Sequence, residues 1–290
     1  NPTTVNPTTV NPTTVNPTTV NPTSTTYEHM SRYIEKLYST HTFLVDSDNP
    51  YFDMYLTYDD KIRLEQNLVG LDGTRVEFNE SFFTPAVEQL KPNTDDNSVI
   101  IYPVFTSAAY YEPGFYTYYR GDCDVSCITD TSFENAIFEY TSSGFTAQIL
   151  HAVGYDFITD IDVDKNPEIL QNYDTVILLH NEYVTKKMFD AITSHPNLIF
   201  LAPNALYAEI DVNHETKTMT LIRGHDYPPE NPVTNGFDYE IEQKFHDYEY
   251  DTKCLEWEFI EIENGFHLNC YPDISFQKLL DILVYMKELT

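Results

Sequence analysis

The sequence predicts an α/β fold: a doubly wound, mostly parallel sheet with β-hairpin additions and an extended N-terminal repeat tail. Between residues 99 and 201, short apolar runs alternate with segments of helical spacing, as in a parallel sheet covered by helices on both faces. After residue 207 the strand-like segments come in pairs that are close enough in sequence to form hairpins. Before residue 27 the chain repeats Asn-Pro-Thr-Thr-Val, a pattern that cannot bury enough surface to fold.

The repeat tail begins with four copies of this pentapeptide and continues with a fifth at Asn21. Proline fixes φ and the β-branched residues resist helix, so we expect an extended chain near polyproline II. Threonine-rich tracts punctuated by proline are typical of O-glycosylated stalks, although an inert linker is the alternative. We expect O-linked glycans on the paired threonines, which are Thr3, Thr4, Thr8, Thr9, Thr13, Thr14, Thr18 and Thr19. Repeated weak contacts favour self-association, or binding to other surface proteins, through residues 1–22.

Three segments are expected: the stalk over 1–26, a helix with a β-rich segment over 27–96, and the α/β domain with hairpin insertions over 97–290. The residues after Thr25 fit a capping box followed by apolar side chains at helical spacing. Residues 42–90 then read mostly as strands. The expected elements there are Thr42–Val45, Phe52–Tyr58 and a hairpin that turns at Asp72 and Gly73.

The α/β segment is predicted to begin with the apolar strand Val99–Phe105. Helical spacing follows over Phe133–Val153 and ends at Gly154, a helix-stop residue. The later expected elements are the strands Tyr155–Thr159, Thr175–Leu179 and Leu198–Leu201, the helix Thr185–Ser194, the hairpins Tyr207–Val212 with Lys217–Ile222 and Leu255–Ile262 with Phe266–Cys270, and a final helix from about Ser275.

Charge excludes one class of partner. The chain carries 16 basic and 46 acidic residues, for a net charge of −30 and a pI near 4.3. Such a chain is repelled by phosphate backbones, so we expect no nucleic-acid partner. No apolar run reaches about 18 residues, so no membrane span is expected in this chain.

Four cysteines, an even number beside a stalk-like tail, favour two disulfides and an extracellular or cell-surface location. Three pairings are open, and we prefer the sequence-local one, Cys123–Cys127 with Cys254–Cys270. Zinc is the rival, but this spacing without nearby histidine matches common zinc sites poorly. Asn79 begins an N-glycosylation acceptor, Asn-Glu-Ser.

The candidate chemistry lies where the predicted strands end. In a doubly wound sheet, ligands bind beyond the carboxyl ends of the strands. Those ends carry Thr106–Tyr119, Asp160–Asp164, His180–Tyr183 and Asn204–Tyr207. His180 and Glu182 are the candidate catalytic residues, because an apolar strand delivers both into one crevice.

At these loops the sequence resembles the glutamine-amidotransferase-like domain of the N,N-dimethylformamidase large-subunit family. The matching stretches are Phe105–Tyr110, Tyr155–Asp162, His180–Tyr183 and Leu201–Tyr207. The resemblance covers roughly residues 97–225 and implies a class I glutamine-amidotransferase-like, flavodoxin-like fold.

The same resemblance implies an iron held by tyrosines and a carboxylate, which activates water as a Lewis acid. Tyr183 and Tyr207 match aromatic positions of the motifs, and Glu182 is the nearest acid, so these three are the candidate metal ligands. The turn His180–Thr185 holds no Cys, Ser or Gly, which excludes the thiol mechanism of true amidotransferases. No late His-x-Glu is present; His267-Leu268-Asn269 is the nearest match.

Calcium is a second cation to consider. Asp160–Asp164 alternates acids like the start of a calcium loop, but Lys165 stands where such loops have Gly and Gln171 where they have Glu. A solvated strand end is the simpler interpretation of this run.

Taken together, these patterns favour an extracellular, glycosylated cell-surface or filament-type structural protein whose amidotransferase-like domain is not catalytic. The alternative is a secreted, iron-dependent amidohydrolase that resembles N,N-dimethylformamidase. A third hypothesis is a carbohydrate-binding module that uses the tyrosine-rich segment Tyr102–Tyr119, because such rings stack on sugars.

Overall fold

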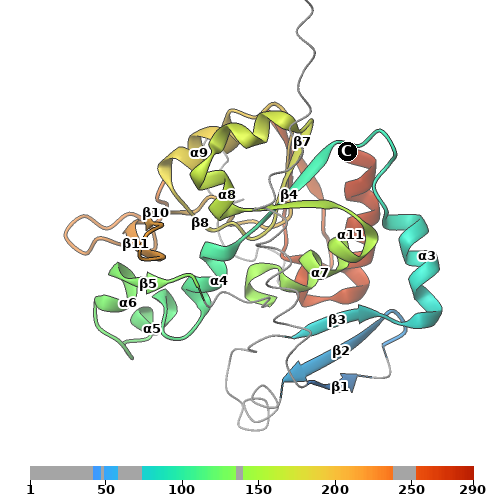
Figure 1. Cartoon of the computed structure of the whole chain (residues 1–290), viewed down its shortest axis with the longest axis horizontal. Coiled ribbons are helices and arrows are strands. Elements are labelled where there is room, and N and C mark those ends of the chain that lie inside the picture. The colour runs from blue at the N-terminus through green and yellow to red at the C-terminus, as the bar shows by residue number, and fades with distance from the viewer. Residues whose placement is uncertain (1–41, 47–48, 58–73, 135–139, 238–252) are drawn as a thin grey trace, which may run out of the picture.

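A computed structural model of the chain describes residues 42–46, 49–57, 74–134, 140–237 and 253–290 (Figure 1). The repeat tail, the helix expected after it and the hairpin turn at Asp72 and Gly73 lie outside the described residues. So do the threonines expected to carry glycans.

The main sheet has six strands in the order β12-β13-β9-β7-β4-β6. Its members are β4 (Ser98–Tyr102), β6 (Asp156–Thr159), β7 (Thr175–Leu178), β9 (Leu198–Phe200), β12 (Phe259–Ile262) and β13 (Gly265–Leu268). All neighbouring pairs from β13 to β6 are parallel, and β12 joins the edge antiparallel. The protein is therefore a mixed α/β protein with a mostly parallel main sheet.

The three central strands are buried on both faces. Every residue of β4, β7 and β9 is buried, which explains why the sequence shows unbroken apolar runs there. Strands of this kind need cover from helices on each side, and their side chains form the centre of the hydrophobic core.

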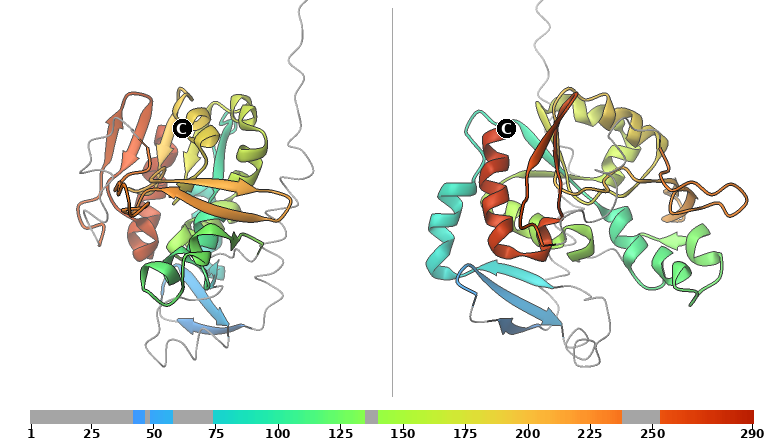
Figure 2. Two further views of the ribbon diagram at one scale, coloured as in Figure 1. Left: turned by 90° about the vertical axis from the view of Figure 1, so that its left-hand side faces the viewer. Right: turned by 180° about the vertical axis from the view of Figure 1, so that it is seen from behind.

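Two smaller sheets complete the β structure. An antiparallel sheet joins β1 (Thr42–Asp46), β2 (Phe52–Thr57) and β3 (Arg75–Phe78). The other has the order β5-β11-β10-β8, from Thr131–Ser132, Thr218–Arg223, Ala208–Asn213 and Tyr183–Val184. Its β10–β11 hairpin lies beside α5 (Phe115–Tyr119) and α6 (Ser126–Thr129), as Figure 2 shows.

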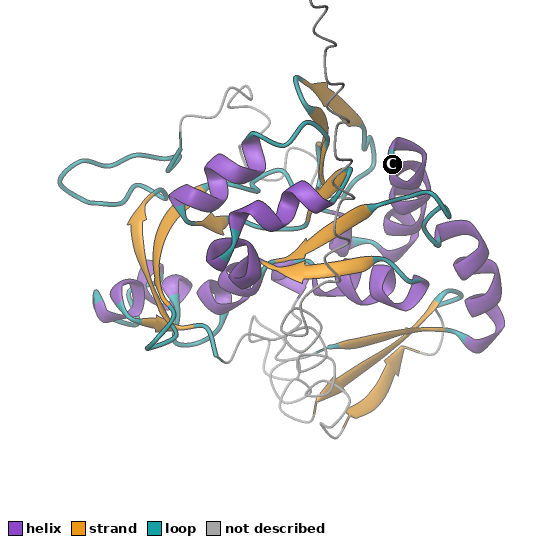
Figure 3. Ribbon diagram, turned by 45° about the horizontal axis from the view of Figure 1, so that its top comes forward, coloured by secondary structure: helices purple, strands orange, loops and turns teal. Residues whose placement is uncertain are grey.

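In the described part of the chain, six helical segments form two contacting groups that flank the main sheet (Figure 3). One group contains α8 (Asp160–Lys165), η2 (Pro167–Asn172) and α9 (Lys186–Thr193). The other contains α3 (Glu80–Leu90), α7 (Gly144–Val153) and α11 (Phe276–Leu289).

Most expected elements of the α/β segment are confirmed to within a few residues, and Gly154 ends α7 with a φ of 99°. The helical stretch expected over Phe133–Val153 is too long, because α7 begins at Gly144. The expectation that residues 42–90 are mostly strands is wrong for Glu80–Leu90, which is α3. There Phe82, Ala86 and Leu90 recur at four-residue spacing and point inward, a helical pattern that the sequence analysis overlooked. The predicted strand Val99–Phe105 is also too long, because α4 (Val104–Tyr110) starts directly after Pro103.

The four cysteines form the preferred pairs, Cys123–Cys127 and Cys254–Cys270. These two disulfides are compatible with an extracellular protein. Among the described residues, no helix is long and apolar enough to cross a bilayer. Asn79 precedes α3, and its amide nitrogen, the atom that would carry sugar, donates to the Asn49 carbonyl at 2.6 Å.

A buried carboxylate fixes the N-terminus of α7 to the C-terminal part of the chain. Asp273, in η3 (Pro272–Ile274), accepts from the backbone N–H of Phe145 at 2.9 Å and of Thr146 at 3.2 Å, and from the Thr146 hydroxyl. Burial raises the pKa of Asp273 from 3.8 to about 7, although the hydrogen bonds from Thr146 and Phe145 oppose that rise.

This raised pKa predicts a pH-dependent stability that Asp273→Asn removes. Between about pH 4 and pH 7 the folded state keeps a proton that the unfolded state has lost, so stability falls as pH rises. We expect the unfolding free energy of the wild type, minus that of the variant, to decrease by up to about 4 kcal/mol over this range. Urea denaturation at a series of pH values measures it. A difference that stays constant would show that Asp273 is ionised throughout.

Candidate functional site

The site forms where two neighbouring strands end and the strand order reverses. From β4 the chain continues to β6 on one side, whereas β7 leads to β9 and β13 on the other. Ligands of open α/β sheets bind beyond the carboxyl ends of strands at such a point. Here α4 follows β4 and carries Thr106 and Tyr110, and the segment 180–182 follows β7.

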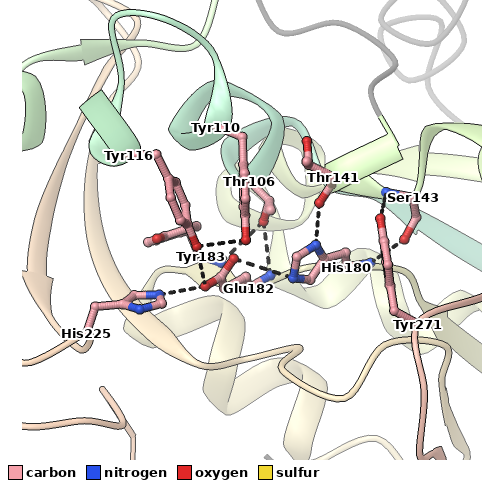
Figure 4. A network of polar contacts seen from close by, with 10 residues as sticks. All are labelled: Thr106, Tyr110, Tyr116, Thr141, Ser143, His180, Glu182, Tyr183, His225 and Tyr271. Atoms are coloured by element: carbon pink, nitrogen blue, oxygen red, sulfur yellow. Dashed lines mark hydrogen bonds and ion pairs between the residues drawn. The ribbon is translucent and has the colours of Figure 1, made fainter. Parts of the chain in front are cut away.

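Glu182 is the centre of the site, and its side chain is fully buried. His225 Nε2 lies 2.6 Å from Oε1, and His180 Nε2 lies 3.4 Å from Oε2. Tyr116 donates from its hydroxyl to Tyr110 at 2.7 Å and lies 3.5 Å from Oε1. Figure 4 shows these side chains converging on the carboxylate from separate elements.

The two phenols come from a compact turn after α4. Tyr110 ends α4 and Tyr116 lies in α5, and their rings stack with centroids 4.0 Å apart. Gly114 makes the turn possible: a Cβ there would lie 2.3 Å from the Tyr111 carbonyl oxygen, closer than any real contact. The chain can therefore double back and place both hydroxyls beside Glu182.

His180 is fixed in orientation by its surroundings. Its Nδ1 contacts the Thr141 carbonyl oxygen, which can only accept, so Nδ1 carries a proton. Its backbone N–H donates to the Ser143 hydroxyl at 3.0 Å, and its ring lies 5.2 Å from that of Tyr271. The remaining nitrogen, Nε2, faces the Glu182 carboxylate.

His225 reaches Glu182 from a strained turn. The backbone N–H of Gly224 donates to the Tyr227 carbonyl, and the N–H of Tyr227 donates to the Gly224 carbonyl. The two residues between them, His225 and Asp226, have φ of 53° and 60°. Such left-handed conformations cost about 1–3 kcal/mol each in residues other than glycine. The surrounding structure maintains this strain and so directs the imidazole at the carboxylate.

The backbone of the 180–183 segment is bound as firmly as its side chains. The buried Thr106 hydroxyl accepts from the N–H of Glu182 at 3.0 Å and of Tyr183 at 3.3 Å. On the other side, Tyr207 N–H donates to the Glu182 carbonyl at 3.0 Å. Leu206, with a φ of 62°, donates to the Asn181 carbonyl.

Electrostatics keep the carboxylate charged and the phenols neutral. Burial raises the pKa of Glu182, but the hydrogen bond and charge of His225, with the charge of His180 and a hydrogen bond from Tyr110, bring it below its usual value. Burial, and then the charge of Glu182, raise the pKa of Tyr183 and of Tyr119. The site thus holds a buried anion beside neutral phenols.

Several buried polar atoms of the site have no hydrogen-bond partner among the described residues. They are Oε2 of Glu182, Nε2 of His180 and the hydroxyls of Tyr119 and Tyr183. Buried polar groups are normally satisfied, and an unsatisfied one costs about 1–3 kcal/mol. Their concentration around one carboxylate indicates a place for a ligand.

The structure brings together all four residues predicted for the crevice. His180, Glu182 and Tyr183 all lie on the 180–183 segment, and the Tyr207 ring lies 4.7 Å from the His225 ring. The sequence analysis missed Tyr110, Tyr116 and His225 as site residues. The tyrosine cluster Tyr102–Tyr119 is the signal in the sequence for two of them, although sugar stacking is the role that the sequence predicts for it. No pattern in the sequence links His225 to Glu182, which lies 43 positions earlier in the chain.

The calcium-loop interpretation of Asp160–Asp164 does not fit the structure, because this run forms the buried helix α8 and each of its three acids binds other parts of the protein. Asp160 accepts from Phe105 N–H at the start of α4, and Asp162 caps its own helix through Thr159. Asp164 binds Thr185, His214 and Lys187. Nor is the run a solvated strand end, since all three acids are buried.

The late His267-Leu268-Asn269 stretch serves the fold. His267 Nε2 contacts the Pro203 carbonyl oxygen at 3.1 Å. The Asn269 side chain bonds the backbone of Glu258 and Glu256, which ties the chain before β12 to β13.

A comparison with known protein families finds a match. The family of N,N-dimethylformamidase beta subunit-like proteins, in its C-terminal region, matches residues 79–246, more than half of the 290-residue chain. The chain belongs to this family. No curated protein matches the chain in sequence. The matched segment contains α4, α5, the 180–183 segment and the His225 turn, and so every residue that surrounds Glu182.

Membership of the dimethylformamidase-like family corrects the functional hypothesis drawn from the tail. The interpretation as a glycosylated cell-surface or filament-type structural protein with a non-catalytic domain is wrong, because the family match links residues 79–246 to N,N-dimethylformamidase beta subunit-like proteins. Repetition is conspicuous in a sequence, whereas a site assembled from distant residues is not.

The Thr106 hydroxyl is the simplest part of the site to test. Thr106→Val keeps the side-chain shape but leaves two buried N–H groups without an acceptor, so we expect a loss of about 1–3 kcal/mol in the free energy of unfolding. Thr106→Ser keeps the hydroxyl and removes one methyl group, at about 0.8 kcal/mol. Urea denaturation of both variants measures the difference. Equal losses would show that the hydroxyl does not support the segment.

Proposed function

We propose that this chain is an iron-dependent hydrolase of small amides, as the dimethylformamidase-like family name suggests. The observation that carries the proposal is the convergence of two phenols on a buried carboxylate. Tyr116 OH lies 2.7 Å from Tyr110 OH and 3.5 Å from Glu182 Oε1. Tyr110 also helps to keep the pKa of the carboxylate below its usual value.

The donor set fits iron. Phenol and carboxylate oxygens are hard ligands, and Oε2 of Glu182 is buried with no hydrogen-bond partner among the described residues. Glu182, Tyr110 and Tyr116 would hold the ion, with Tyr110 and Tyr116 in place of the initially favoured Tyr183 and Tyr207. When bound, iron would supply a Lewis acid that polarises an amide carbonyl and acidifies water.

The protein's own residues supply position and protons. His180, held by Thr141 through Nδ1, presents Nε2 as a group that can take up or release a proton beside the carboxylate. Such a group suits protonation of the departing amine of an amide. The rings of Tyr183, Tyr207 and Tyr119 enclose the His225 side of the site and limit access of bulk water.

The amidotransferase-like, doubly wound arrangement is part of the same proposal. Taken in chain order, the five parallel strands lie as 2-1-3-4-5, which is the flavodoxin-like order. The turn after β7 carries His180 and Glu182 where an amidotransferase would carry its thiol nucleophile. The proposed division of the chain at residues 26 and 96 would leave this whole arrangement in the last segment.

Iron binding tests the proposal directly. Protein produced with iron should contain about one iron per chain and, when ferric, absorb visible light through a phenolate-to-iron transition. Glu182→Gln should lose the iron and Tyr110→Phe should weaken or shift the band. Glu112→Gln, which alters an exposed carboxylate in the same loop, is the control and should retain both. Wild-type protein without iron, or without the band, would refute the proposed function.

His180 should affect turnover of small N-alkylated formamides. We expect His180→Gln to lower kcat by about 10²–10⁴-fold with little change in iron content, because a proton-transfer group is lost. His195→Gln is the matched control: His195 is buried, contacts the carbonyl oxygens of Tyr173 and Asn197, and lies outside the site. Unchanged kcat in His180→Gln would remove His180 from the mechanism.

A further inference from the structure

The turn that carries His225 is fixed from several directions. Outside its own Gly224–Tyr227 pairing, His225 N–H donates to the Thr234 carbonyl at 2.9 Å and Asp226 N–H to the Val233 carbonyl at 3.0 Å. The Thr234 hydroxyl donates to the Asp226 carboxylate at 3.2 Å. The segment that contains Val233 and Thr234 thus holds the two consecutive left-handed residues in place.

The imidazole itself is enclosed by aromatic rings. The Tyr183 ring stacks on it at 5.6 Å and 26°, and the rings of Tyr207 and Tyr119 lie at 4.7 Å and 5.4 Å. These contacts hold the ring plane, so that Nε2 points at Glu182.

The two carboxylate oxygens of Glu182 differ in their hydrogen-bond partners. Oε1 is bound by His225 and lies near Tyr116, whereas Oε2 has no hydrogen-bond partner among the described residues. His180 does not compensate, because its Nε2 lies 3.4 Å from Oε2 without hydrogen-bond geometry.

We propose that His225 is a positioning residue that selects the oxygen of Glu182 available to the iron: it occupies Oε1 and leaves Oε2 as the ligand atom. The inference rests on the proposed function and deepens it. A buried carboxylate without such a donor could rotate about its last bond and present either oxygen. Groups that orient the ligands of a metal in this way typically change metal affinity by about 10–100-fold.

The chain offers a matched control for this experiment. His214 Nε2 also lies 2.6 Å from a buried carboxylate, that of Asp164, on the β10–β11 hairpin and outside the site. His214→Ala therefore removes a contact of the same kind and length. Any effect specific to the iron must appear in His225→Ala and be absent from His214→Ala.

The experiment compares wild type, His225→Ala, His225→Gln and His214→Ala by iron titration, visible absorption and thermal unfolding. We expect His225→Ala to bind iron about 10–100-fold more weakly with a shifted band. The side-chain amide of His225→Gln can also donate to Oε1 of Glu182, so this variant should recover most of the iron affinity and of the original band. His214→Ala should unfold at a lower temperature with iron affinity and band unchanged.

The outcomes separate the inference from the proposed function. Wild-type iron affinity and an unshifted band in a folded His225→Ala would overturn the positioning role alone. So would equal weakening in His225→Ala and His214→Ala, since that would reflect general destabilisation. Absence of iron from the wild type would overturn the proposed function and this inference with it.

Discussion

The buried carboxylate of Glu182 is the constraint on which the site depends. An ionised carboxylate without partners is far too costly to bury, so the fold must bring donors to it. His225 from the turn after β11 and Tyr116 from the α4–α5 turn supply them, and His180, on the same segment as Glu182, adds an imidazole whose Nε2 lies 3.4 Å from Oε2. Removing one donor would leave a charge that the others only partly compensate.

Backbone strain is concentrated around the same group. Among the described residues, six other than glycine have positive φ, and four of them hold the 180–182 segment or belong to the His225 turn: Ser143, Leu206, His225 and Asp226. Ser143 accepts from His180 N–H, and Leu206 donates to Asn181. Strain at a functional site persists only where surrounding contacts over-determine it, and here hydrogen bonds surround each strained residue.

The architecture explains how one site can use such distant residues. The strand order reverses between β4 and β7, and the segments that follow these two strands leave the sheet side by side. The segment after β7 leads into β8 of the small sheet β5-β11-β10-β8. Because β8 pairs with β10, Tyr207, just before β10, and His225, just after β11, lie close to Glu182. The small sheet therefore belongs to the site as much as the main sheet does.

The sequence by itself determined the α/β class and most strands and helices after residue 97, and it predicted His180, Glu182, Tyr183 and Tyr207 as neighbours. Apolar runs and motif order carry that information locally. The helix Glu80–Leu90 is also encoded locally, in its four-residue apolar spacing. The sequence could not determine that Asp160–Asp164 is a buried helix instead of a cation loop. Only the tertiary structure decided that Tyr110, Tyr116 and His225 meet at Glu182. That convergence depends on the order of the strands and on residues with left-handed backbone conformations. Contacts between residues far apart in sequence stabilise these strained conformations.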